Sequence, residues 1–216
     1  MAKNNSENIR IIYSNSNLEF RENLNQIETD QKIRVVILGF TDELTFIEKT
    51  GFDNDLIYKI ENFPLPIITI IKNQASGFLF EIVLASHLCI ASESAKFEIA
   101  DREKLKKQIG SKNAEKLNSI ENKFDAKTAL DLGIVNKITT VENPEKEALE
   151  TVKKISELAP IAISYCLKAV NQGLEMDLKD GLNLETELFS RIFATVDMKE
   201  GTSAFLEKRE PVFNGQ

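Results

Sequence analysis

The 216-residue chain contains no tryptophan, one histidine and two cysteines. Two cysteines are too few for the disulfide framework of a small secreted domain, and because Cys89 and Cys166 both have apolar neighbours, we expect two reduced, buried thiols. A single histidine excludes a metal site built from several imidazoles, and a Ser-His-Asp triad would depend on His87 alone. We expect His87 to be a partly buried histidine whose hydrogen bonds are satisfied.

The chain also has fewer basic than acidic residues. It contains 27 lysines and arginines and 34 aspartates and glutamates, which gives a formal net charge of -7. Binding to a polyphosphate backbone depends on clustered Lys and Arg, so this balance argues against a nucleic-acid partner. A local basic run at residues 102–116 is interrupted by Glu103 and Glu115, which is typical of a solvated face.

Long apolar runs are missing as well. None reaches the about 18 residues that a membrane-spanning helix needs, and residues 1–10 lack the apolar centre of a secretory signal. We therefore expect a cytoplasmic protein that has no membrane partner.

Hydrophobic residues make up 42% of the chain and charged residues 28%, which is the usage of an ordinary globular protein. Three short runs rich in β-branched residues predict buried strands at residues 9–13, 33–38 and 67–71. Between them, apolar residues at helical spacing predict helices at residues 17–29 and 56–63. This alternation of strand and helix predicts an α/β fold with a parallel sheet.

The rest of the chain becomes increasingly helical. Ser76 is a credible N-cap for a helix, and Gly133 is a natural C-cap for another. Further elements are expected as short strands at residues 88–91, 96–99 and 134–138, and as helices at residues 125–132, 145–158, 161–172 and 182–194. Helical layers with exposed apolar faces often belong to oligomer contacts.

Two carboxylates stand out as candidates for chemistry. Glu81 is the one acidic residue in a run otherwise suited to a core, and ionised carboxylates are rarely buried without a partner. It could equally lie in the first turns of a helix and point to water. Asp101 follows a predicted strand, where α/β folds place their chemistry, but it also begins a charged stretch and could be an ordinary solvated residue.

The sequence around these carboxylates resembles the crotonase (enoyl-CoA hydratase/isomerase) family. The resemblance is carried by four segments in the family's order: PIITIIKNQASGFLFE at residues 66–81, LCIASESAKF at 88–97, FDAKTALDLGIVNKI at 124–138 and FATVDMKEGTSAFLEKR at 193–209. The last segment is the most specific of the four. The resemblance covers roughly residues 17–213.

The resemblance implies a spiral of ββα units with a helical C-terminal layer, assembled as homotrimers or homohexamers. Residues 1–158 would form the α/β core and residues 159–216 a helical trimerisation region, in one compact unit. The implied substrates are acyl thioesters of coenzyme A, which is part of the substrate, and no cofactor or metal is expected. Hydration, isomerisation and decarboxylation all occur on this framework.

The resemblance also implies roles for particular residues. Glu81 and Asp101 correspond to the two catalytic carboxylates, which in hydratases flank one water. The backbone N–H of Phe78, beside Gly77, corresponds to one donor of the oxyanion hole that stabilises the enolate-like thioester oxygen. Phe205 and Lys208 in the tail correspond to positions that contact the coenzyme A nucleotide, often across a subunit boundary.

The chain departs from the family in three places. The glycine-rich turn before Glu81 is reduced to Ser76, Gly77 and bulky residues. The loop that supplies the second oxyanion N–H is not recognisable in residues 40–49, and the segment after Asp101 is short. Two alternatives therefore stay open: an enzyme acting on an acyl-carrier-protein thioester, or a catalytically degenerate relative that serves as a structural or regulatory subunit.

Overall fold

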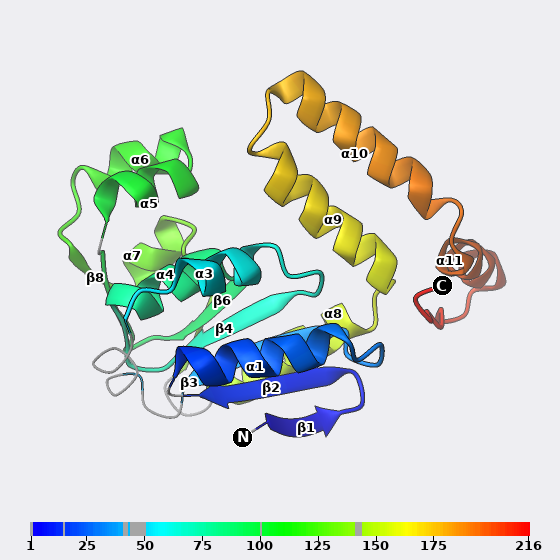
Figure 1. Cartoon of the computed structure of the whole chain (residues 1–216), viewed down its shortest axis with the longest axis horizontal. Helices are drawn as coiled ribbons and strands as arrows, with labels where there is room; N and C mark the ends of the chain where they lie inside the picture. The colour runs from blue at the N-terminus through cyan, green and yellow to red at the C-terminus, as the bar shows by residue number, and fades with distance from the viewer. Residues whose placement is uncertain (1, 15, 41–42, 44–50, 100, 141–143) are drawn as a thin grey trace.

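A computed structural model describes the chain except for residues 1, 15, 41–42, 44–50, 100 and 141–143. Its centre is a six-stranded sheet with the strand order β1-β2-β3-β4-β6-β9 (Figure 1). The antiparallel pair β1–β2 lies at one edge, and the other neighbours are parallel. The strands are β1 (Ala2–Ser6), β2 (Ile9–Ser14), β3 (Val35–Phe40), β4 (Ile67–Ile71), β6 (Leu88–Ser92) and β9 (Lys137–Thr139).

Both faces of this sheet are covered by helices. On one face the strands pack against α1 (Asn17–Glu28), α3 (Asn54–Glu61) and α4 (Gly77–Ala85) in the larger core. On the other face α8 (Pro144–Ser156) inserts Ala148 and Val152 among the alternate strand side chains. Sheets buried on both faces read as continuous apolar runs, which is why β3 and β4 contain almost no polar side chain.

A second, three-stranded sheet lies beside the first and has the order β5-β7-β8. Its strands are β5 (Gln74–Ala75), β7 (Lys96–Glu98) and β8 (Lys123–Asp125), and they are followed or joined by α5 (Arg102–Gln108), α6 (Ser111–Leu117) and α7 (Ala126–Asp131). Phe97 and Phe124 point inward from this sheet and pack against Phe80 of α4. The three rings fasten the small sheet to the helix that carries Glu81.

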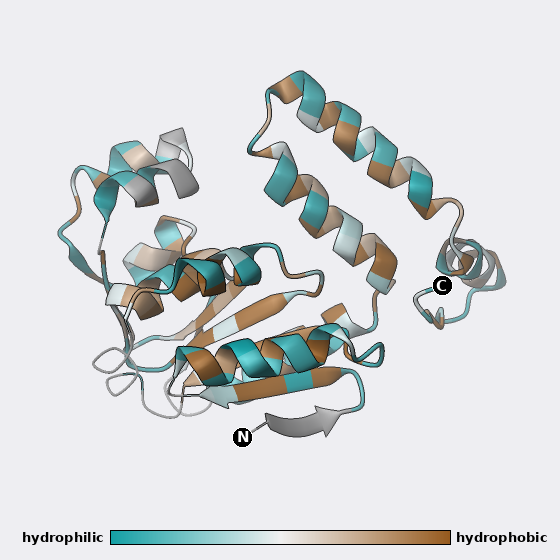
Figure 2. Cartoon of the chain, viewed as in Figure 1, coloured by the Kyte–Doolittle hydropathy of each residue, from teal (hydrophilic) through white to brown (hydrophobic). Residues whose placement is uncertain are grey.

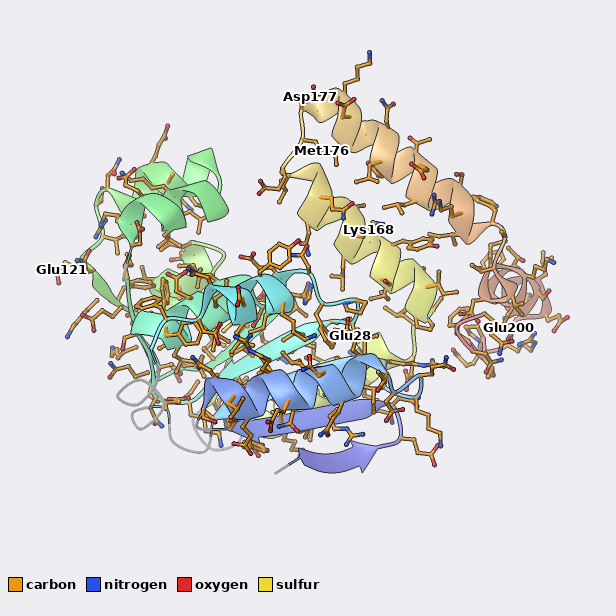
Figure 3. All side chains as sticks on the ribbon, viewed as in Figure 1. Glu28, Glu121, Lys168, Met176, Asp177 and Glu200 are labelled. Carbon is orange, nitrogen blue, oxygen red and sulfur yellow. The ribbon has the colours of Figure 1, made fainter. Side chains whose placement is uncertain are left out.

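The C-terminal helices α9 (Pro160–Gly173), α10 (Leu178–Ile192) and α11 (Val196–Glu207) extend away from the sheet (Figure 1). Helices α9 and α10 pack as an antiparallel pair, approaching closely where Gly173 lies against Gly181, and Met176 and Asp177 occupy their outer tip (Figure 3). Hydrophobic residues lie along both helices (Figure 2). Many are exposed, including Leu174 and Leu178 at 80% each.

Most predicted elements are confirmed, including the strand at residues 67–71 and the helix that follows Ser16. The strand predicted at residues 134–138 is displaced, because β9 begins only at Lys137. One thiol prediction was wrong: Cys89 is buried and free, but Cys166 is exposed, since its helix face is left uncovered. Within the described ranges, no helix combines the length and apolar character that a membrane span requires.

Candidate functional site

The site is built around the start of α4. Strand β4 ends at Ile71, residues 72–74 form a turn, and β5 leads to Ser76, which has the extended conformation of an N-cap. The predicted N-cap position is therefore correct, but the Ser76 side chain makes no capping hydrogen bond and its Oγ accepts one from Gln74 Nε2 at 3.2 Å. Gly77 then takes a φ of 54°, which is the left-handed region that glycine tolerates best. The backbone thus turns sharply into a helix whose first N–H groups favour negative charge.

Glu81 lies one helical turn further along α4 and is 4% exposed. The alternative that it points to water is wrong, because the helix is surrounded and only Gly77 and Leu84 among its nine residues are not buried. Burying a carboxylate in an apolar helix is costly unless it is paired or hydrogen-bonded. Its position is what a general acid or base requires if it is to be shielded from bulk solvent.

Asp101 lies in a different setting, because it is exposed and opens α5. Its Oδ1 accepts a hydrogen bond from Glu103 N at 3.0 Å, and its carbonyl accepts one from Leu105 N at 3.1 Å. Asp101 therefore acts as an N-cap, a structural role that the sequence interpretation did not include. Helix α4 contacts β7, which ends three residues before Asp101.

The side chain of Phe78 is buried and packs edge-to-face against Phe52, with ring centroids 5.8 Å apart. Phe52 is largely exposed. The aromatic pair covers the first turn of α4 from the outside. The described loop before α3 is held in place by Asp53, which caps α3 through Leu56 N and pairs with Arg21 of α1 at 2.5 Å.

The sequence interpretation missed Glu43. The stretch 40–49, in which the family's second oxyanion donor could not be recognised, lies outside the described residues except for Phe40 and Glu43. Glu43 is 4% exposed, and its carboxylate accepts hydrogen bonds from three consecutive backbone N–H groups, those of Lys72 at 2.6 Å, Asn73 at 2.7 Å and Gln74 at 2.8 Å. Nothing in its local sequence signals burial, because its partners lie about 30 residues later.

Phe205 and Lys208 lie on or just after α11, on the opposite side of the molecule from α4 and α5 (Figure 1). Phe205 is 82% exposed. Lys208 ends the helix with a φ of 56°, an unusual conformation for a residue with a side chain. Within one chain, these two residues are therefore not brought to Glu81 and Asp101.

Only one of the two ring nitrogens of His87 has a hydrogen-bond partner within the described residues, whereas the sequence predicted that both would be satisfied. Its Nδ1 accepts a hydrogen bond from Ile67 N at 3.0 Å, whereas its buried Nε2 has no hydrogen-bond partner within the described part of the chain. Burial lowers the pKa of this imidazole to about 4. A neutral, structural histidine fits this setting better than a general base working near neutral pH.

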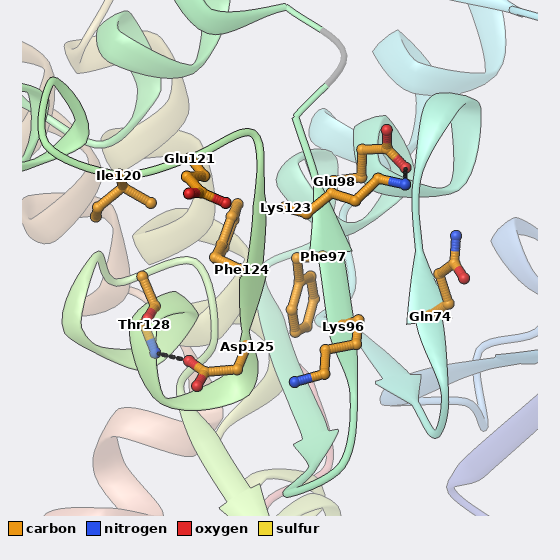
Figure 4. Close-up of a pocket in the computed structure, with 10 residues that line it drawn as sticks. All are labelled: Gln74, Lys96, Phe97, Glu98, Ile120, Glu121, Lys123, Phe124, Asp125 and Thr128. Atoms are coloured by element: carbon orange, nitrogen blue, oxygen red, sulfur yellow. Dashed lines mark hydrogen bonds and ion pairs between the residues drawn. The ribbon is translucent and has the colours of Figure 1, made fainter.

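A surface hollow of about 600 Å³ lies beside the small sheet (Figure 4). Its rim carries charges of both signs, and Lys123 pairs with Glu98 at 3.5 Å. Neither Glu81 nor Asp101 lines it. The hollow thus holds neither of the two candidate carboxylates, and the buried one on α4 marks the centre of the candidate site.

Comparisons with known proteins give a consistent result. A family model described as enoyl-CoA hydratase/isomerase matches residues 45–216. A probable enoyl-CoA hydratase of Bacillus subtilis is 30% identical over 225 residues, covering 89% of this chain and 86% of that protein. A probable mitochondrial enoyl-CoA hydratase 2 of Arabidopsis thaliana is 30% identical over 167 residues, covering 72% of this chain but only 56% of that protein.

The solved structures agree with these relatives. A crystal structure of an enoyl-CoA hydratase from Bacillus anthracis superposes with a TM-score of 0.84 at 25% sequence identity, covering 100% of this chain and 99% of that chain.

Proposed function

The chain belongs to the enoyl-CoA hydratase/isomerase family of enzymes, and we propose that it acts on an enoyl thioester through an enolate-like intermediate. The observation that carries this proposal is the enclosed carboxylate of Glu81, one turn beyond a helix start that presents backbone N–H groups. An enolate needs hydrogen-bond donors at its oxygen and a proton carrier near its carbon atoms. The start of α4 offers both kinds of group within four residues.

In the proposed hydration, the N–H of Phe78, set by the turn at Gly77, donates to the thioester oxygen as it gains negative charge. Glu81 removes a proton from water as the water oxygen bonds to the β carbon. Asp101 delivers a proton to the α carbon, which completes the addition of water. The same groups catalyse isomerisation if the water is absent and one carboxylate moves a proton between two carbon atoms of the acyl group.

Binding of the coenzyme A nucleotide is proposed for Phe205 and Lys208. The exposed ring offers a stacking surface, and the lysine offers a charge for a phosphate. Lys208 ends α11 in a left-handed conformation, and Arg209 N bonds to Ala204 O at 3.0 Å, which is a common way for a helix to end. Because this end of the molecule is far from α4, we propose that these residues serve the site of a neighbouring subunit in a homotrimer or homohexamer.

Hydration of crotonyl-CoA by the purified protein is the direct test. We expect turnover, and we expect Glu81→Ala and Glu81→Gln to lower kcat by about 10²–10⁴-fold, the usual contribution of general acid–base catalysis. Glu22→Gln on the exposed surface of α1 is the matched control and should leave kcat unchanged. Turnover that survives both Glu81 substitutions would rule out the mechanism.

A second candidate function is favoured by one observation, the capping role of Asp101. If this carboxylate serves only as a cap, the chain is a degenerate relative that acts as a structural or regulatory subunit. Asp101→Asn separates proton exchange from helix capping, because asparagine caps helices as well as aspartate but cannot exchange a proton. We expect Asp101→Asn to retain thermal stability and lose most of its turnover.

The carrier of the acyl group is tested with matched thioesters. If crotonyl-CoA is not turned over, the same crotonyl group on an acyl carrier protein should be offered. Background rates with both substrates would favour the non-catalytic alternative.

A further inference from the structure

The three hydrogen bonds to Glu43 all end on one turn, which links β4 to β5. The donors are the consecutive N–H groups of Lys72, Asn73 and Gln74, and their distances of 2.6 to 2.8 Å are typical of bonds to a charged acceptor. Consecutive N–H groups that converge on an anion form a concave binding surface for it. Glu43 fills that surface from a segment that precedes the turn by about 30 residues.

A buried carboxylate is kept only where its charge is well compensated. Glu43 is enclosed, and together with burial its charge raises the pKa of the thiol of Cys89 on β6. The carboxylate thus lies close to the parallel sheet, and the turn is tied to the interior of the molecule through its main chain.

The same turn is held a second time through a side chain. Lys72 Nζ pairs with Glu145 Oε1 of α8 at 2.6 Å, and Glu145 also bonds to Tyr13 of β2. The Lys72–Glu145 pair is half exposed, and surface ion pairs of this kind contribute little. The main chain of the turn is therefore restrained by the hydrogen bonds to Glu43 and by Asn73 O, which accepts a hydrogen bond from Lys96 N at 2.9 Å.

The turn leads directly into the start of α4. Gln74, which donates to Glu43, is also the first residue of β5 and lies four residues before Phe78. Only Ala75, Ser76 and Gly77 separate them, and the Ser76 side chain does not cap the helix. The placement of the Phe78 N–H thus depends on where the turn is held and on the pairing of Ala75 with Phe97 of β7.

We propose that Glu43 is a positioning residue, which sets the Phe78 N–H for the thioester oxygen by fixing the turn at residues 72–74. This inference rests on the proposed function. An oxyanion donor has to lie within a few tenths of an ångström of its working position, and a displacement of about 1 Å can cost roughly 10²-fold in rate. Glu43 reaches no reacting atom under this proposal; it acts through the backbone of the turn.

The test compares Glu43→Ala and Glu43→Gln with the unaltered protein. The Ala variant removes all three acceptor interactions, whereas the Gln variant keeps one oxygen and places an amide NH₂ toward the donors. We expect kcat for crotonyl-CoA to fall by about 10-fold to 10²-fold in the Ala variant and less in the Gln variant. KM should change by less than about 3-fold, because ground-state contacts are kept.

Formate provides a rescue that a general loss of stability would not show. The Ala variant leaves an anion-binding turn without its carboxylate, so added formate should restore part of kcat, while the unaltered protein should not respond. Asp125→Ala is the control for stability, since it removes a carboxylate that accepts the N–H of Thr128 at 2.9 Å and caps α7. It should lower the melting temperature and leave kcat unchanged.

Amide hydrogen exchange tests the proposal without any turnover. In Glu43→Ala, exchange should accelerate at residues 72–74 and also at Phe78. Acceleration confined to residues 72–74, or no acceleration at all, would overturn the positioning role, as would an unchanged kcat with faster exchange. If the unaltered protein turns over no thioester, the proposed function fails, and the exchange at Phe78 still decides whether Glu43 positions this N–H.

Discussion

At the scale of a residue, burial gives His87 a structural role and lowers the pKa of its imidazole. Its Nδ1 accepts a hydrogen bond from the N–H of Ile67, so the neutral form of the imidazole holds the start of β4. Burial lowers its pKa to about 4, against 6.5 for an ordinary histidine. Between these two values the unfolded chain binds a proton that the folded chain does not, so the free energy of unfolding falls as the pH falls.

We therefore expect the stability contributed by His87 to be complete above pH 6.5 and to be lost progressively toward pH 4, by up to roughly 3 kcal/mol at about 1.4 kcal/mol per pKa unit. Urea unfolding of the protein and of His87→Asn, compared from pH 7.5 to 4.5, isolates the effect, since asparagine keeps an acceptor for Ile67 N. Because the chain has one histidine, NMR titration of its ring protons gives the pKa directly. A pKa near 6.5 would contradict the prediction.

The same scale explains why Glu81 and Asp101 were hard to separate from ordinary residues. Each had a plausible structural alternative in the sequence, and the structure treats them differently: Glu81 is enclosed, whereas Asp101 is exposed and caps a helix. Their proposed joint role in catalysis depends on the family resemblance. The Asp101→Asn variant tests Asp101, which has helix capping as a second explanation.

At the scale of an element, α4 begins on a conformation that most residues avoid. Gly77 has a φ of 54°, and a Cβ added there would meet no atom within 4 Å. Any cost of a side chain is therefore conformational and not steric. Gly51 provides a natural comparison, because a Cβ added there also meets nothing within 4 Å and its φ lies outside the left-handed region.

We predict that Gly77→Ala lowers the free energy of unfolding by about 1 kcal/mol, because alanine resists the left-handed region. Gly51→Ala should be neutral or stabilise by up to about 1 kcal/mol, since it restricts only the unfolded chain. Urea denaturation of both variants measures the difference. Equal effects of the two substitutions would show that α4 can begin without the positive φ.

At the scale of the molecule, the C-terminal helices are incompletely covered. A groove between α9 and α10 is lined by apolar residues that include Val170, Leu182 and Phe189. Phe189 is 60% exposed and stacks edge-to-face with Phe193. Apolar surface of this extent on a folded chain marks an interaction site, which agrees with the proposed assembly of several copies.

We expect the protein to form trimers or hexamers in solution and Phe189→Glu to shift it to smaller species, because a buried charge without a partner weakens an interface. Lys168→Glu on α9 is the control, since Lys168 is exposed and does not line the groove (Figure 3). Light scattering after size exclusion gives the masses. A monomeric unaltered protein, or an unchanged mass for Phe189→Glu, would contradict the proposed assembly.

The fold class could be predicted because it depends on local patterns. Apolar runs of strand length alternate with helical periodicity over residues 9–71, and the structure has parallel strands and helices in that order. The crotonase-type fold is confirmed by the superposition on a known member. Strands β1, β5 and β8 were not predicted, because runs of two to five residues can acquire strand geometry from the partner with which they pair.

Local sequence thus determined the parallel α/β layering, the helix at residues 17–29, the position of Ser76 before α4 and the two carboxylates worth testing, because hydrophobic periodicity acts over a few residues. The tertiary structure alone decided that Glu81 is enclosed, that Cys166 is exposed and that Glu43 holds the turn before Phe78. Burial and hydrogen bonding at these positions depend on residues distant in the chain, which no local pattern encodes.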